Sequence, residues 1–403
     1  MMINRREFLE TASAGLTVTA LGQGVQAQDG SDPLGVRDDF PVVETGTYLN
    51  APYITPSPRT ATEAVSQFNH AKARQPVPLG AMLEQKESVR NRFAKLVNAS
   101  PQEIGFLSAT SDGENTIAHA LDLKAGDNVV LDELHFSTSY ILYRHLEQEL
   151  GIELRIAKAV AGAVPVTAFE PLVDDRTRLI SVAWVAHQNG FLHDVDGLAD
   201  LAHSKGAYLY ADAIQAAGMV PIDVQQTPID CFASGTYKWL LGGYGIAPCF
   251  VRESILDRVP PDRRGFLQVK RELPNYQYEF HKGARKLEYA TPAFAAFYEL
   301  GAGLEYLERI GIDRIHAHGV ALAQRVRQGL VELGLRPVTP EGNQTAIVAF
   351  ENPIDPEVAT QLFDEANIQL TFREGGRQIR VGAALFNTES DIDIFLETAA
   401  RLV

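Results

Sequence analysis

The fold is decided by two stretches of the chain, 209-LYADAIQ-215 and 232-FASGTYKW-239. Each begins with the apolar residues of a buried strand and continues into a polar side chain, Asp212 in the first and Lys238 in the second. Taken singly, Asp212 could cap a helix and Lys238 could be a surface lysine. Ligands of α/β sheets bind beyond the carboxyl ends of parallel strands, so we look for chemistry at these two positions.

Around these stretches, short apolar runs alternate with longer segments of helical periodicity. Strands are predicted at 128–131, 178–184, 207–211, 231–234 and 246–251, and helices at 60–97 and 195–205. This alternation predicts an α/β fold with a mostly parallel sheet covered by helices on both faces. After residue 302 the pattern changes to a helix at 304–333, a strand at 345–351 and a last helix at 391–402, which predicts a smaller α+β unit.

A third stretch, 106-FLSATSDGEN-115, places small hydroxyl residues before a helix predicted at 115–121. The free N–H groups and the dipole at a helix start form a phosphate site. A phosphate cradle, an acid at one strand end and a lysine beyond the next are what pyridoxal 5′-phosphate (PLP) requires. The lysine forms an imine with PLP, and the acid keeps the ring nitrogen protonated.

These stretches resemble the class V aminotransferase group of fold-type I PLP enzymes, which includes cysteine desulfurases, kynureninases and isopenicillin N epimerase-like proteins. The most specific part is 212-DAIQ-215 followed by 234-SGTYKWLLGG-243. The resemblance implies a seven-stranded, mostly parallel sheet between helices, plus a smaller α+β domain. We therefore expect an N-terminal joining segment at 28–60, a large PLP-binding domain at 61–302 and a small C-terminal domain at 303–403.

The resemblance also implies the cofactor contacts. The phosphate is assigned to Thr110, Ser111 and Tyr237, the ring nitrogen to Asp212, the ring hydroxyl to Gln215 and the imine to Lys238. His135 would stack on the ring, and Phe136 is the alternative because a shift of one residue exchanges them. His187 stands where the family often has an asparagine near a cofactor oxygen. Substrate contact and proton transfer are both open for it.

Two further segments are assigned by the same resemblance. The stretch 288-EYATP-292 is similar to a Gly-Thr element that reaches the phosphate of the neighbouring subunit, with Ala290 in place of glycine, so Thr291 implies a homodimer. Arg380 lies in 378-QIRVG-382, which resembles the segment whose arginine binds the substrate carboxylate. A guanidinium offers two parallel donors for that task. We expect Asn50, in the N-terminal segment, on the substrate side as well.

The sequence restricts the reaction only in part. A cysteine desulfurase needs a nucleophilic cysteine shortly before the substrate arginine, but the two cysteines, Cys231 and Cys249, fall in or beside predicted core strands. We rank transamination-type chemistry first, with epimerisation, β-elimination by a C–S lyase and kynureninase-like hydrolysis as alternatives. A periplasmic binding protein with a retired PLP site is the non-enzyme alternative, although Asp212, Lys238 and Arg380 are all present.

The first 27 residues resemble a twin-arginine export signal, with Arg5 and Arg6 before an apolar stretch and small residues up to Ala27. The signal implies a periplasmic enzyme, and the stretch is too short and weakly apolar for a membrane span. The formal charge of −15, from 36 Lys and Arg against 51 Asp and Glu, argues against nucleic acid as a partner. Two cysteines and the lack of a His-Glu-x-x-His spacing argue against a metal site.

Overall fold

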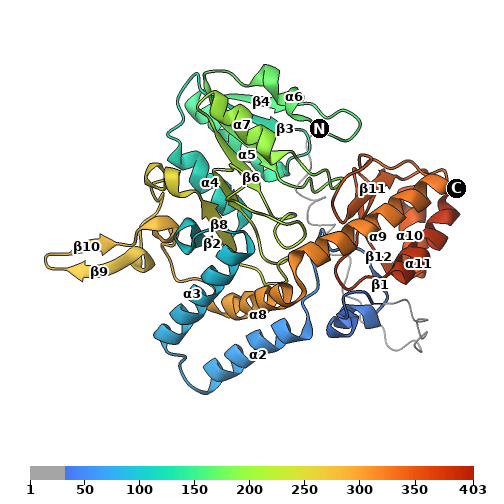
Figure 1. Cartoon of the computed structure of the whole chain (residues 1–403), viewed down its shortest axis with the longest axis horizontal. Coiled ribbons are helices and arrows are strands. Elements are labelled where there is room, and N and C mark those ends of the chain that lie inside the picture. The colour runs from blue at the N-terminus through green and yellow to red at the C-terminus, as the bar shows by residue number, and fades with distance from the viewer. Residues whose placement is uncertain (1–31) are drawn as a thin grey trace. The chain divides into compact units, whose positions relative to one another are not determined.

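A computed structural model describes residues 32–403 and places a seven-stranded sheet at their centre, in the order β2-β8-β7-β6-β5-β3-β4 (Figure 1). The strands are β2 (Ile104–Leu107), β3 (Asn128–Asp132), β4 (Glu153–Ala157), β5 (Thr177–Ala183), β6 (Tyr208–Asp212), β7 (Cys231–Ala233) and β8 (Ala247–Val251). Only β8 is antiparallel to its neighbours, β2 and β7. The predicted α/β fold with a mostly parallel sheet is confirmed, whereas the export signal at 1–27 lies outside the described residues.

Helices bury both faces of this sheet, because successive side chains of a strand point to opposite sides. On one face Val130 packs in a cluster with α3 (Leu79–Leu96), α7 (Val195–Ser204) and α8 (Phe294–Ile310). On the other face Val129 packs with α4 (Thr110–Ala120) and α5 (Ser137–Leu150). The sheet is therefore buried on both sides, as its near-continuous apolar strands require.

The direction of the strands places the ends of six strands at one edge of the sheet, and the loops after five of them meet there. Because β8 alone runs against the others, the chain leaves β2, β3, β5, β6 and β7 at the same edge. The candidate site residues of the sequence analysis lie in the segments that follow these strands.

The C-terminal part contains α9 (Ile312–Glu332), α10 (Pro356–Glu365) and α11 (Glu389–Ala399) with an antiparallel sheet of β11 (Ile347–Glu351), β14 (Gln378–Gly382) and β13 (Thr371–Arg373). The short strand β1 (Thr47–Tyr48) pairs with β12 (Ile368–Gln369), and Asn50 bridges to Gly382. The N-terminal segment is thus bound to the C-terminal part next to Arg380.

Two predicted helices are each divided in the structure. The helix predicted at 60–97 is two helices, α2 (Arg59–Arg74) and α3, because Pro76 and Pro78 interrupt it. The helix predicted at 304–333 is α8 followed by α9, separated at Gly311, whose φ is +91°. The predicted domain boundary between 302 and 303 consequently falls inside α8. Within residues 32–403, no helix has the length and apolar character that crossing a membrane requires.

Candidate active site

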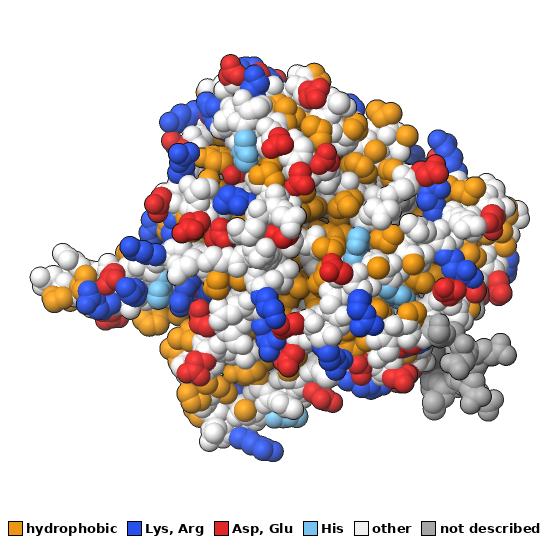
Figure 2. Space-filling view, in the orientation of Figure 1, with side chains coloured by type: hydrophobic (Ala, Val, Ile, Leu, Met, Phe, Trp, Pro, Cys, Tyr) orange, Lys and Arg blue, Asp and Glu red, His pale blue; other side chains and the backbone are white. Residues whose placement is uncertain are grey.

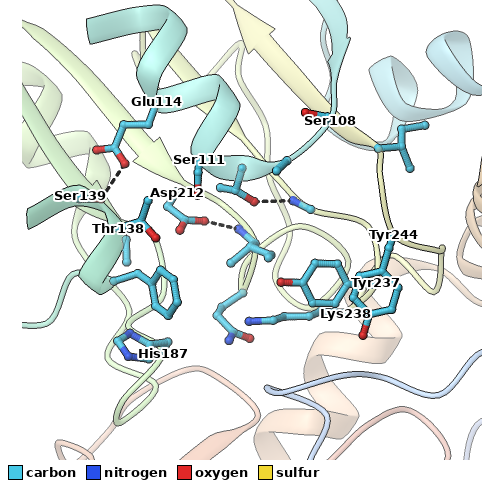
Figure 3. Close-up of a pocket in the computed structure, with 18 of the residues that line it drawn as sticks. Ser108, Ser111, Glu114, Thr138, Ser139, His187, Asp212, Tyr237, Lys238 and Tyr244 are labelled. Atoms are coloured by element: carbon cyan, nitrogen blue, oxygen red, sulfur yellow. Dashed lines mark hydrogen bonds between the residues drawn. The ribbon is translucent and has the colours of Figure 1, made fainter. Parts of the chain in front are cut away.

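A cavity of about 200 Å³ lies where the five loops meet, and residues from all of them line it (Figure 3). Seven residues that the sequence predicted for the site are in its wall, namely Thr110, Ser111, His187, Asp212, Gln215, Tyr237 and Lys238. They are far apart in the sequence, from Thr110 to Lys238. The sheet topology brings them together.

The start of α4 provides the anion-binding end of the cavity. No side chain caps this helix, and although the Asp112 N–H donates to the Ala109 carbonyl at 3.1 Å, the N–H groups of Thr110 and Ser111 have no partner among the described residues and are free for a ligand. The Thr110 hydroxyl accepts a hydrogen bond from the Gly235 N–H at 2.8 Å. This bond fixes the helix start against the loop that carries Lys238.

Asp212 is buried and Lys238 is half-buried in the cavity wall, and the low exposure alters the proton affinity of each. Asp212 ends β6 and accepts a hydrogen bond from the Ile214 N–H at 2.9 Å, and a turn rather than a helix follows it. Burial raises the pKa of Asp212. Burial, and then the positive charge of Arg380, lower the pKa of Lys238 to about 7, against the opposing charge of Asp212. A large share of Lys238 is therefore an uncharged, nucleophilic amine at neutral pH.

Gln215 and Tyr237 support this centre. Gln215 donates to the Pro52 carbonyl at 2.8 Å and accepts from the Trp239 indole at 2.7 Å, so it joins the N-terminal segment to the lysine loop. Its second N–H remains for a ligand. The Tyr237 ring stacks on Tyr244 with centroids 4.5 Å apart. These contacts hold the walls on either side of Lys238.

His135 lies behind the cavity wall, and its alternative Phe136 lies in the wall. The His135 ring is fully buried, and its nitrogens lie 3.1 and 3.2 Å from the hydroxyls of Ser181 and Ser139, behind the cavity wall. Phe136, the alternative, lines the cavity and is 39% exposed. The His135 side chain turns into the protein interior, whereas that of the next residue, Phe136, turns toward the cavity. Sequence periodicity alone does not resolve such a difference between neighbours. The geometry places Phe136 where a ring could stack.

His187 lies opposite Phe136, with the two rings edge to face at 5.1 Å. Burial, together with the charges of Arg373, Arg380 and Lys238, lowers the pKa of His187 well below its usual value, so the ring is neutral. Its Nδ1 atom is buried and has no hydrogen-bond partner among the described residues. The position therefore offers one unused imidazole nitrogen to whatever occupies the cavity.

Arg380 lies just behind the wall at His187. Its guanidinium donates to the His187 carbonyl and, at 3.4 Å, to the Thr371 hydroxyl, which itself donates to Asn50. Arg380 and Asn50 are thus linked to each other, though neither is part of the cavity wall. Thr291 is exposed and also lies outside the wall.

Comparisons with known proteins show the family of this chain. The family model of aminotransferase class V matches residues 47–395. The chain belongs to the aminotransferase class-V family. It is 27% identical to an uncharacterized aminotransferase of Bacillus subtilis, over 89% of this chain and 95% of the relative. It is 28% identical to a probable cysteine desulfurase of Methanothermobacter thermautotrophicus, over 91% and 97% of the two chains.

The solved structures match this fold over nearly their whole length. The complex of a cystine C–S lyase with its product cysteine persulfide superimposes with a TM-score of 0.84 at 19% identity, covering 90% of this chain and 99% of that one. PLP is the cofactor of this class V chain. The residues present fit PLP: an uncapped helix start for the phosphate, a buried carboxyl for the ring nitrogen, and an unpartnered His187 nitrogen.

Three neighbours of the site were missed by the sequence analysis. Glu114 and Tyr244 line the cavity, and the charge of Arg373 acts on Lys238 and His187. Glu114 could have been found, because it lies one helical turn after Ser111 on the same face of α4. The positions of Tyr244 and Arg373 depend on loop and strand geometry that no spacing in the sequence encodes.

Proposed function

We propose that the chain is an enzyme that acts on the amino group of an amino acid, free or peptide-linked, by transamination-type chemistry. The observation that carries the proposal is the convergence of the Lys238 amine, the Asp212 carboxyl and the uncapped start of α4 on one cavity. Bound PLP would supply an electron sink for the substrate α-carbon.

The chain's own residues divide the remaining work. Lys238 is the base in the cavity that can take a proton from the substrate α-carbon and return it elsewhere, because its pKa of about 7 matches that task. Arg380 would hold the substrate carboxylate, since its partners among residues 32–403 are a carbonyl and a hydroxyl and its Nε has no partner there. The neutral His187 would accept or donate one hydrogen bond through Nδ1.

β-Elimination by a C–S lyase is the second candidate, and the fold likeness to a cystine C–S lyase favours it. Desulfuration through an enzyme persulfide is disfavoured for this chain. Cys231 and Cys249 are both fully buried in the sheet, and burial raises the pKa of each thiol. A lyase that releases the sulfur with its product needs no such thiol. Epimerisation and kynureninase-like hydrolysis stay as outcomes that the experiment distinguishes.

The test is the visible spectrum of the PLP-loaded protein, with Lys238→Ala as its control. The wild type should show a pH-dependent band of lysine-bound PLP, and the variant should lack it. Amino acids that convert the band to the pyridoxamine form would indicate transamination, whereas release of pyruvate and a sulfur product from cystine would indicate elimination. A wild type without any such band after reconstitution overturns the proposal and favours a binding protein.

We also propose that the enzyme is a homodimer. The exposed position of Thr291 supports this, as does the hairpin of β9 (Val269–Leu273) and β10 (Gln277–Phe280), which extends outward in Figure 1 and forms the projection at the left of Figure 2. Its aromatic side chains are unusually exposed, with Tyr276 at 93% and Tyr278 at 46%. Light scattering that gives the mass of one chain at full PLP occupancy would contradict the dimer.

Export to the periplasm is proposed from the paired arginines at 5 and 6. A fusion of residues 1–40 to a reporter that is active only after twin-arginine export tests it. The fusion should be exported, and a variant with Arg5→Lys and Arg6→Lys should not. Equal export of both fusions, or of neither, would overturn this proposal.

A further inference from the structure

Glu114 is a buried acid in the cavity wall to which the proposed chemistry gives no task. It is 3% exposed, on the face of α4 that also carries Ser111. One carboxylate oxygen accepts from the Ser181 hydroxyl at 2.7 Å. The other accepts from the Ser139 hydroxyl at 2.6 Å (Figure 3). Both oxygens therefore accept hydrogen bonds, as an ionised carboxylate does.

His135 closes these contacts into a ring of four side chains. Its Nε2 lies 3.1 Å from the Ser181 hydroxyl and its Nδ1 lies 3.2 Å from the Ser139 hydroxyl. Nδ1 also accepts the Phe136 N–H at 2.8 Å, so an imidazole proton on Nε2 points to Ser181, while the Ser139 proton goes to Glu114. Among the described residues no lysine or arginine lies within 4 Å of Glu114, whose one ion-pair contact is this histidine at 3.9 Å. The Glu114 carboxylate therefore accepts hydrogen bonds, but no lysine or arginine among the described residues neutralises its charge.

Asp212 is the group that this charge acts on. A charge without a counter-ion in a buried site acts strongly on its neighbours, because little water screens it. The titratable groups that face Asp212 are Glu114 on α4, His135 before α5, Tyr210 on β6, and Tyr237 and Lys238 after β7. Glu114 is the anion of this set that lines the same cavity as Asp212. Burial is the main cause of the raised pKa of Asp212, and the charge of Glu114 adds to it against the hydrogen bond from Ile214 and the opposing charges of His135 and Lys238.

We propose that Glu114 is a positioning residue whose buried charge keeps a proton bound between Asp212 and the cofactor ring nitrogen. This proposal rests on the proposed PLP function. Without that proton, the Asp212 carboxylate and the ring nitrogen together carry one negative charge. With the proton, their net charge is zero. A second negative charge nearby favours the neutral pair, so the proton is held to higher pH. The ring can then accept electrons over a wider pH range.

The test follows the ring nitrogen directly, by NMR of the holoenzyme loaded with ¹⁵N-labelled PLP across a pH series. Glu114→Gln keeps the shape and removes the charge, so it should lower the proton affinity of the ring nitrogen at least tenfold, about one pH unit. Glu114→Asp keeps the charge and should restore most of this affinity. The matched control is Glu103→Gln, which removes another buried carboxylate, at the far end of β2, and should leave the ring nitrogen unchanged.

The outcomes separate this proposal from the proposed function. A wild type that binds no PLP overturns the proposed function. If PLP binds and the ring nitrogens of wild type and Glu114→Gln titrate together, the role of Glu114 is overturned. Should Glu114→Gln fail to fold, Glu114→Leu fills a similar volume without needing the serine donors and carries the same expectation.

Discussion

Two buried arginines, Arg90 on α3 and Arg380 on β14, are equally inaccessible but have opposite surroundings. Arg90 is 1% exposed and lies 2.7 Å from the Glu288 carboxylate and 3.1 Å from Glu87. Arg380 is 2% exposed, yet its partners are a carbonyl and a hydroxyl, and its Nε has no partner among the described residues. The first guanidinium has its counter-ions within the chain, and the second does not.

The pKa values of the two arginines express this difference. Burial alone would lower the pKa of Arg90, but the charge of Glu288 and the contacts with Glu87 outweigh it and raise the pKa. Burial, and then the charge of Arg373, lower the pKa of Arg380 well below the usual value. Leaving a buried charge without a counter-ion costs stability. We infer that the ion pairs of Arg90 with Glu87 and Glu288 stabilise the fold. We infer that Arg380 instead binds an anion that is not part of the chain.

The largest effect on stability is expected at the paired cluster. Arg90→Gln leaves the buried Glu288 with Lys86 as its remaining cation and should lower the free energy of unfolding by about 3–5 kcal/mol. Urea unfolding of the apoprotein measures it. Arg92→Gln on the same helix breaks partly exposed pairs with Glu305 and Glu308, and should cost at most about 1 kcal/mol. If both variants lost the same free energy of unfolding, the buried ion pairs of Arg90 would contribute no more to stability than the partly exposed pairs of Arg92.

Substitution of Arg380, which has no counter-ion among the described residues, should reduce activity without reducing stability. Arg380→Gln removes the charged donors proposed for the substrate carboxylate, so kcat/KM should fall on the order of 10–100-fold, mostly through KM. The free energy of unfolding should stay the same or rise, because a buried charge without a counter-ion is gone. Steady-state kinetics and urea unfolding check the two parts. A large loss of stability with KM unchanged would show that Arg380 is structural.

Much of this comparison could be drawn from the sequence, but not all. The apolar runs of the sequence predicted five strands of the large sheet, and each predicted end lies within one residue of the end in the structure. This is possible because buried parallel strands are nearly continuous in apolar residues. The short strands β2 and β4 were not predicted, and neither was the break at Gly311. The inward turn of His135 and the ring around Glu114 depend on packing between α4, α5 and β5, which no local pattern reports.

The pH dependence of stability provides a finer test on Lys238. Its pKa is about 7 in the folded chain and 10.5 in the unfolded one, so between these values the unfolded state binds more protons and the free energy of unfolding rises with pH. Lys238→Met removes this contribution. The apoprotein variant should exceed the wild type in stability most at or below about pH 7, and the excess should vanish as pH approaches 10.5. A constant difference across this window in urea unfolding would mean that the amine has an ordinary pKa.

The smallest effect is expected at the two cysteines, and it bears directly on the reaction. Cys231 and Cys249 lie on neighbouring strands, β7 and β8, with no exposed surface, and burial raises the pKa of Cys249 to about 12. A thiol held in its protonated form inside a sheet is a poor nucleophile. The double variant Cys231→Ala and Cys249→Ala should therefore keep its turnover within about twofold, and iodoacetamide should not inhibit the native enzyme.

Inhibition by iodoacetamide that the double variant escapes would instead place a thiol in the reaction. One of the two strands would then have to open during turnover, and the family likeness to cysteine desulfurases would extend to the mechanism. Without that result, the lysine, the acid and the unpaired arginine carry the chemistry, and sulfur can enter the reaction only with the substrate.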